Sequence, residues 1–183
     1  MRRTVELSTG LRAPMARAGE VLVAEPASVV TDDSTPDERR LRRLNTTLGI
    51  DLGPAGRLEA RVVVEMGTAR ADVDRTTIAV RWHAAGWERM FPAFAGVLEA
   101  RKEGEAAALV LRGTYTVPLG PLGGFGDGLA GRRVAGRSLT AFLEQAARRL
   151  DAEVDRRYSA AAAPSLSPYL VALRELGSGY PVG

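Results

Sequence analysis

The longest helical pattern in the chain runs from about Gly128 to Arg157, and it constrains the fold more than any other feature. Apolar residues recur along it at steps of three and four, the spacing that places side chains on one face of a helix. Charged residues of the stretch, Asp151 among them, fall largely off this stripe. A helix cannot bury such a stripe alone, so the upstream residues are predicted to pack against it. The stripe consists of Val134, Ala135, Leu139, Phe142, Leu143, Ala146, Leu150 and Val154.

Upstream of this helix, apolar and polar residues alternate with the two-residue period of half-buried strands. The alternation is clearest over residues 44–52 and 58–66, which a short turn separates, so these two segments predict a hairpin. Such short connections make neighbouring strands antiparallel. Further strands are predicted over residues 3–9, 76–83, 97–102 and 106–117, and a short helix over residues 15–23.

This element order predicts an α+β fold with about six antiparallel strands and one long C-terminal helix. A twisted antiparallel sheet curls as strands are added to it. One helix rarely fills the concave side of a curled sheet, so a cavity is expected between the sheet and the helix. The expectation rests on space alone and specifies no chemistry.

Two segments resemble the START-like superfamily, also called SRPBCC. They are residues 82–99, WHAAGWERMFPAFAGVLE, and residues 111–120, LRGTYTVPLG, the second followed by a glycine-rich loop and the long helix. The resemblance implies a helix-grip fold over residues 1–157, in which a curved antiparallel sheet surrounds a long C-terminal helix. The superfamily includes lipid carriers, plant hormone binders, polyketide cyclases and aromatases, coenzyme-Q-binding proteins and many uncharacterised bacterial members, and the chain looks most like the last group.

Residues 158–183 extend beyond the resemblance as a C-terminal tail. Within the tail, Ser167 and Pro168 have the residue types that open a helix, and Gly177 has the type that ends one. Between them the apolar residues have helical spacing, which predicts a short amphipathic helix. This helix is free to pack on the domain, to cover the cavity or to contact a partner subunit, and no feature of the sequence selects an oligomeric state. Its apolar residues are Tyr169, Leu170, Leu173 and Leu176.

Large side chains on the inward-facing strand positions and on the helix are predicted to line the cavity. Tyr115 shares its strand face with Leu109 and Leu111, so its ring is expected to point inward, where its hydroxyl needs a hydrogen-bond partner. Large apolar residues also fill ordinary cores, which is the competing interpretation of the same set. The predicted lining residues are Met66, Trp82, Phe91, Phe94, Tyr115 and Phe142.

Composition excludes several kinds of site. Without cysteine, the chain has no disulfides, thiolate metal sites or thiol nucleophiles. The sole histidine, His83, rules out a two-histidine metal site, and strand alternation places it opposite Trp82 on the outer face. No catalytic residue, metal or cofactor is therefore predicted.

Charge and hydropathy restrict the partners. The formal net charge is only +3, and Lys102 is the one lysine among 25 basic residues, so no nucleic-acid partner is predicted. No apolar run approaches the length of about 18 residues that spans a bilayer. The first residues, MRRTVELSTG, have no apolar core of a secretory signal. A cytoplasmic location without stable membrane insertion is expected.

Three functions fit these observations. The first is binding or carriage of a small hydrophobic molecule, which needs a lined cavity and no catalytic group. The second is a polyketide cyclase- or dehydratase-like reaction in the same cavity, but the predicted inward positions are almost all apolar apart from Tyr115. The third is a non-enzymatic protein-interaction module whose cavity is filled by side chains. We favour the first.

Overall fold

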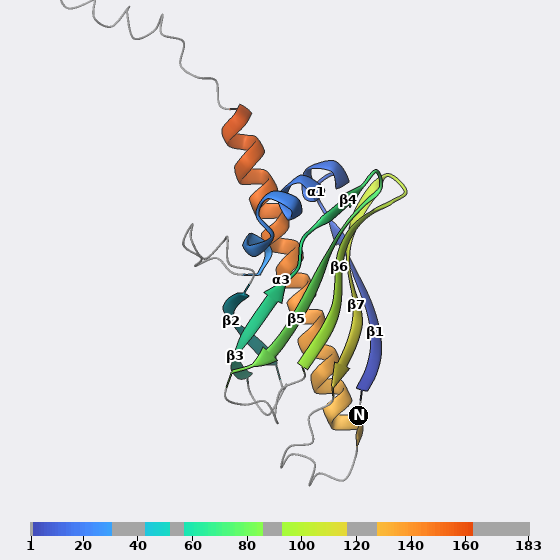
Figure 1. The fold of residues 1–183 in the computed structure, drawn as a ribbon, viewed down its shortest axis with the longest axis vertical. Coiled ribbons are helices and arrows are strands. Elements are labelled where there is room, and N and C mark those ends of the chain that lie inside the picture. Colours follow the sequence, from blue (N-terminus) through green and yellow to red (C-terminus); the bar gives the residue numbers. More distant parts are fainter. Residues whose placement is uncertain (1, 31–42, 52–56, 86–92, 117–127, 163–183) are drawn as a thin grey trace, which may run out of the picture.

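The computed structural model describes residues 2–30, 43–51, 57–85, 93–116 and 128–162. It confirms the α+β fold, with one curved antiparallel sheet and a long C-terminal helix along its concave side (Figure 1). The elements follow in the order β1 (Arg2–Leu11), α1 (Met15–Ala24), the 3-10 helix η1 (Pro26–Val29), β2 (Arg43–Asp51), β3 (Arg57–Met66), β4 (Arg70–Asp72), β5 (Arg75–Ala84), β6 (Ala93–Glu103), β7 (Ala106–Thr116) and α3 (Gly128–Ala162).

The sheet has seven strands, of which six form the path β1-β7-β6-β5-β3-β2 and β4 pairs with β5 alone. All pairings are antiparallel, as the short connections predict. A two-residue loop joins β6 to β7, and its first residue, Gly104, has φ of 62°, which a type II′ turn requires at that position. β1 forms one edge of the sheet and pairs with β7, so the first and last of the described strands are hydrogen-bonded neighbours.

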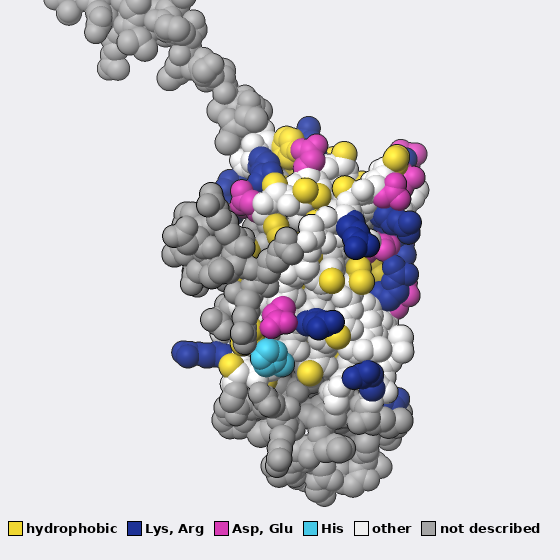
Figure 2. Space-filling view, viewed as in Figure 1, with side chains coloured by type: hydrophobic (Ala, Val, Ile, Leu, Met, Phe, Trp, Pro, Cys, Tyr) yellow, Lys and Arg dark blue, Asp and Glu magenta, His cyan; other side chains and the backbone are white. Residues whose placement is uncertain are grey.

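Alternation along the strands separates a buried inner face from a largely exposed outer face. On β5 the inner positions are all buried, and they are Thr76, Ile78, Val80, Trp82 and Ala84. Figure 2 shows the outer face, where charged side chains and the histidine lie among smaller residues. The helix α3 supplies the opposite wall of the core with Leu139, Phe142, Leu143, Ala146, Ala147, Leu150 and Val154.

The predicted apolar stripe of the helix is thus confirmed from Leu139 to Val154, while the side chains of Val134 and Ala135 lie outside the described residues. The helix ends at Ala162, five residues after the predicted end at Arg157. Alanine has the highest helix propensity, so the alanines of this segment extend the helix.

Asp151 falls off the apolar stripe but is buried, with its side chain 8% exposed. Its Oδ1 accepts hydrogen bonds from the backbone N–H groups of Arg12 at 3.1 Å and Ala13 at 3.0 Å. The Nε of Arg12 lies 3.4 Å from Oδ2. The carboxylate thereby accepts hydrogen bonds from two backbone N–H groups in the connection between β1 and α1, where no strand or helix hydrogen bond is available to them. This contact fixes the first helix and the first strand to α3.

Two strand boundaries also differ from the sequence prediction. Residues 67–74, which lie between two predicted strands, contain β4, whose three residues are all exposed and therefore show no alternation. The sixth strand begins at Ala93 rather than at Val97. Two alanines and Gly96 among its first four residues are weak strand formers, so only Phe94 indicates a strand there.

Candidate ligand-binding site

The helix α3 lies close to the edges of the sheet and further from its centre. The backbone of α3 comes close to the backbones of β1, β2 and β7. Among the described residues it makes few or no such close approaches to β3, β5 and β6. A sheet that curls around a helix brings its edge strands onto the helix first. The helix α1 covers part of the central strands, since its backbone approaches β5 and β6. The remaining space between these strands and α3 is left to large side chains or to a ligand.

Aromatic rings bridge this space. The rings of Trp82 on β5 and Phe94 on β6 are stacked, with centroids 4.3 Å apart and planes at 20°. The ring of Phe142 on α3 packs on Trp82 from the other side, with centroids 4.6 Å apart and planes at 39°. All three side chains are 2–3% exposed. Sheet and helix are thus joined by one aromatic cluster, defined here as Trp82, Phe94 and Phe142, which lies where β5 nears its end and β6 begins.

Two glycines make room for this cluster. Gly96 and Gly113 are directly opposite each other on β6 and β7, and the Cζ atom of Phe94 lies close to both. A Cβ atom on Gly96 would lie 2.7 Å from that Cζ and 2.2 Å from the carbonyl oxygen of Arg112. The Phe94 ring therefore covers the position that two side chains would otherwise occupy. Glycine pairs of this kind allow a sheet to bend, and an aromatic ring over them restores the buried contact.

The cluster belongs to a row of inner-face residues that crosses the sheet. Strand register places Trp82 opposite Phe94, Phe94 opposite Tyr115, and Tyr115 opposite Arg3. Tyr115 is buried, as predicted, and Arg3 is half-buried. The aromatic row therefore ends at a phenol and a guanidinium, both capable of hydrogen bonding to a polar group of a ligand.

Arg3 was not among the predicted inward residues, although its alternation with Val5 and Leu7 was readable from the sequence. The expectation that the inward strand positions are almost all apolar apart from Tyr115 is therefore wrong for Arg3. Thr9 on β1, Thr46 on β2 and Thr76 on β5 also occupy inner positions. Threonine is common on strands because its branched side chain packs well there, so a threonine gives no sequence signal of a site.

The other predicted lining residues divide into two cases. Met66 is buried on the same face, opposite Val80 on β5. Phe91 lies outside the described residues. His83 alternates with Trp82 and is partly exposed opposite Val63, on the outer face as expected.

The inner face of the described strands lacks the commonest acid–base side chains. On the strands, none of the described inner positions is His, Asp or Glu. No group of three or more potential metal-ligating His, Asp or Glu side chains occurs in the described ranges. None of the described helices contains a stretch suited to crossing a bilayer.

The sequence matches no family profile and no curated protein. Similar solved structures include the di-domain aromatase/cyclase StfQ from the steffimycin biosynthetic pathway, at 16% identity and a TM-score of 0.48. That match covers 87% of this chain and 53% of StfQ, so the chain spans about half of that protein.

Two further similar structures are matched over most of their own length. The Zhui aromatase/cyclase from Streptomyces sp. R1128 has 14% identity and a TM-score of 0.44, with 86% of this chain and 96% of that chain covered. The Arabidopsis thaliana protein At1g70830, of the major latex protein family, has 11% identity and a TM-score of 0.46, with 84% and 94% covered. Identities this low concern the fold alone. The curved antiparallel sheet around the long helix α3 is itself the helix-grip arrangement.

Proposed function

We propose that the chain binds a small hydrophobic molecule between the concave face of the sheet and α3. The observation that carries this proposal is the separation of α3 from the central strands, which rings of the aromatic cluster bridge. Binding sites for small molecules are concave, mostly apolar and contain a few polar groups. Met66, Phe91 and the aromatic cluster supply apolar lining in this proposal, and Tyr115 and Arg3 supply the polar end. The ligand-binding domain comprises residues 1–157 and acts in the cytoplasm.

Burial of the aromatic cluster favours a second candidate function. Trp82, Phe94 and Phe142 pack on one another and are 2–3% exposed, as side chains of a filled core are. An interior filled by its own side chains leaves no cavity for a ligand, which is the arrangement expected of a non-enzymatic interaction module. A cyclase-like reaction has less support, because the described inner strand positions carry no His, Asp or Glu, the side chains that most often act as general acid or base.

A thermal-shift screen distinguishes the first two candidates. A ligand at 100 times its Kd stabilises the folded state by about 2.7 kcal/mol. For a chain of this size, each kcal/mol moves the melting temperature by roughly 2–4 °C. A panel of fatty acids, isoprenoids, sterols and aromatic polyketides is therefore expected to contain at least one compound that raises the melting temperature by about 5–10 °C.

Two variants locate the binding compound. Tyr115→Phe removes the hydroxyl and keeps the ring, so it should reduce the shift of a ligand that accepts a hydrogen bond from Tyr115. Arg81→Ala changes an exposed outer-face position and should leave the shift unchanged. Absence of any shift across the panel, with both variants folded, would favour the interaction module.

A further inference from the structure

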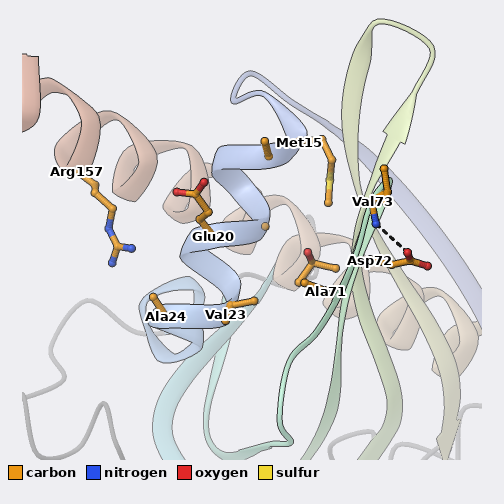
Figure 3. A pocket seen from close by; sticks show the side chains of 11 residues that line it. Met15, Glu20, Val23, Ala24, Ala71, Asp72, Val73 and Arg157 are labelled. Atoms are coloured by element: carbon orange, nitrogen blue, oxygen red, sulfur yellow. Dashed lines mark hydrogen bonds between the residues drawn. The ribbon is translucent and has the colours of Figure 1, made fainter.

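An apolar groove of about 550 Å³ lies outside the proposed ligand site, between α1 and the hairpin of β4 and β5 (Figure 3). Thr76 of β5 lines it, and Gly19 of α1 packs so closely that a Cβ there would lie 2.7 Å from the Thr76 Oγ1. Met15 extends from α1 toward the hairpin in Figure 3. The apolar lining is contributed by Met15, Ala16, Val23, Ala24, Ala71 and Val73.

Both walls of the groove expose a large apolar side chain. Val73 at the tip of the hairpin is 91% exposed, and Val23 on α1 is 50% exposed. They are the two exposed large hydrophobic residues among those that the structure describes. Both lie at one groove, and exposed apolar side chains that lie together favour a contact surface over the scattered exposure that is normal for single residues.

The helix α3 passes this groove just before it ends. Arg157 lines the groove, and its Nη2 donates to Glu25 Oε1 at 2.9 Å. The adjacent residue, Tyr158, also contacts α1. Its hydroxyl donates a hydrogen bond to Glu20, and the guanidinium of Arg17 stacks over its ring, 4.4 Å from the ring centroid. The end of α3 is thus held against α1 at the edge of the groove.

The sequence that follows is long enough to return to the groove. Ala162 lies five residues beyond Arg157, or about 7.5 Å further along the helix axis. The seven residues from Ala162 to Tyr169 span up to about 23 Å when extended. This reach exceeds the roughly 7.5 Å along the helix axis back to the level of Arg157, which lines the groove.

Residues 167–177 have the pattern of a helix that would fit there. Their apolar residues lie on one side of the predicted helix, and amphipathic helices bind grooves through such residues. Arg174 flanks that side, and the rim of the groove carries Glu20 and Asp72. The apolar stripe therefore matches the groove. Charge does not decide the contact, because Glu20 accepts a hydrogen bond from Tyr158, Asp72 pairs with Arg75 and Arg157 also lines the groove.

We propose that residues 167–177 dock as a helix in this groove, tethered by α3, and cover Val23 and Val73. The occupant is the chain's own C-terminal segment. The groove shares Thr76 with the inner face of the sheet, but Thr76 and Trp82 lie at opposite ends of β5, so the docking holds whether or not a ligand binds beside Trp82.

Paired cysteines test the contact, because the chain contains no cysteine of its own. In a Val73→Cys/Leu173→Cys variant at low protein concentration, mild oxidation should give an intramolecular disulfide in most molecules, measured by intact mass and non-reducing electrophoresis. The matched control is Arg61→Cys/Leu173→Cys, since Arg61 is exposed on the outer face of β3, away from the groove, and it should remain largely unlinked. Linkage at the control level in both variants would overturn the proposal. Disulfides between chains would overturn it in favour of a second copy's segment.

Hydrogen exchange supplies a second readout with the native sequence. Docking should slow the exchange of residues 168–176 at least about tenfold relative to a Val23→Asp/Val73→Asp variant. Both substituted side chains are exposed, so far-UV circular dichroism should show the variant folded. Equal and unprotected exchange in the two proteins would contradict the docking.

Discussion

The ring of Trp82 lies flat on the ring of Phe94, with centroids 4.3 Å apart. The two residues are register partners on β5 and β6, so the stack is built across neighbouring strands. Phe142 then connects this stack to α3. Aromatic pairs of this kind stabilise a fold by about 0.5–1.5 kcal/mol beyond the burial of their area. The aromatic cluster is therefore both a structural link and the proposed wall of the ligand site.

Phe142→Ala tests the structural role of the cluster. It should lower the free energy of unfolding by about 3–5 kcal/mol, because the substitution leaves a cavity beside Trp82. Arg148→Ala on the same helix is the control, since its side chain is 70% exposed and lies 3.9 Å from Glu144. The control should cost well under about 1 kcal/mol. Similar losses in urea denaturation of the two variants would show that α3 buries a different face.

Gly96→Ala tests the bend of the sheet under Phe94. The new Cβ would lie 2.2 Å from the carbonyl oxygen of Arg112, and a backbone atom cannot move aside as a side chain can. A loss of about 3 kcal/mol, at the upper end for overpacked sites, is expected in chemical denaturation. At Gly10 on β1 a Cβ meets nothing within 4 Å, so Gly10→Ala should be neutral or stabilise slightly. Equal effects at both glycines would contradict the close approach of β6 and β7.

Asp151→Ala tests the buried carboxylate. Two backbone N–H groups lose their acceptor, and each unmet buried donor costs about 1–3 kcal/mol. The expected loss is roughly 2–4 kcal/mol because the Arg12 amide is only partly buried. Asp155→Ala removes a 67% exposed partner of the same arginine and should cost less than about 1 kcal/mol. Thermal denaturation of both variants measures the difference, and a small effect at Asp151 would mean that water replaces its contacts.

Tyr158 should titrate late. Its hydrogen bond to Glu20 raises the pKa of the phenol above 10.0, with desolvation acting in the same direction. A folded-state pKa above the unfolded value means that this contact stabilises the protein fully below about pH 10 and is lost as the pH rises through the folded-state pKa. The difference in tyrosinate absorbance between the native protein and Tyr158→Phe isolates the transition. Glu20→Ala should move its midpoint down toward 10, and a native midpoint at or below 10 would contradict the bond.

Periodicity was sufficient to predict most of the fold. Alternation and helical spacing report which face of an element is buried, so the strands around Leu44, Val64, Ile78 and Leu111 and the stripe of α3 were predictable. The large inward residues of the candidate site followed from the same rule. Trp82, Phe94 and Phe142 proved to share one cluster, which only the strand register and the course of α3 could bring together.

Residues whose environment depends on distant backbone were not predictable. Asp151 looked like a surface residue because charged side chains rarely lie inside a protein without a partner. Its partners are amides 138 and 139 positions away in sequence. The start of β6 was missed for a related reason, since Gly96 weakens a strand pattern unless its pairing with Gly113 under Phe94 is known. The charge of Arg3 likewise concealed its inward position.

Fluorescence of Trp82 tests the central claim most directly. A Trp87→Phe variant leaves Trp82 as the one tryptophan of the chain. Brominated acyl, isoprenoid and aromatic compounds quench tryptophan on contact, and each is titrated into this variant. If a hydrophobic ligand binds between the sheet and α3, at least one compound should quench Trp82 saturably with a stoichiometry of one per chain, and excess unbrominated analogue should restore the emission. A folded variant whose Trp82 emission is not saturably quenched by any of these compounds would contradict the proposed site.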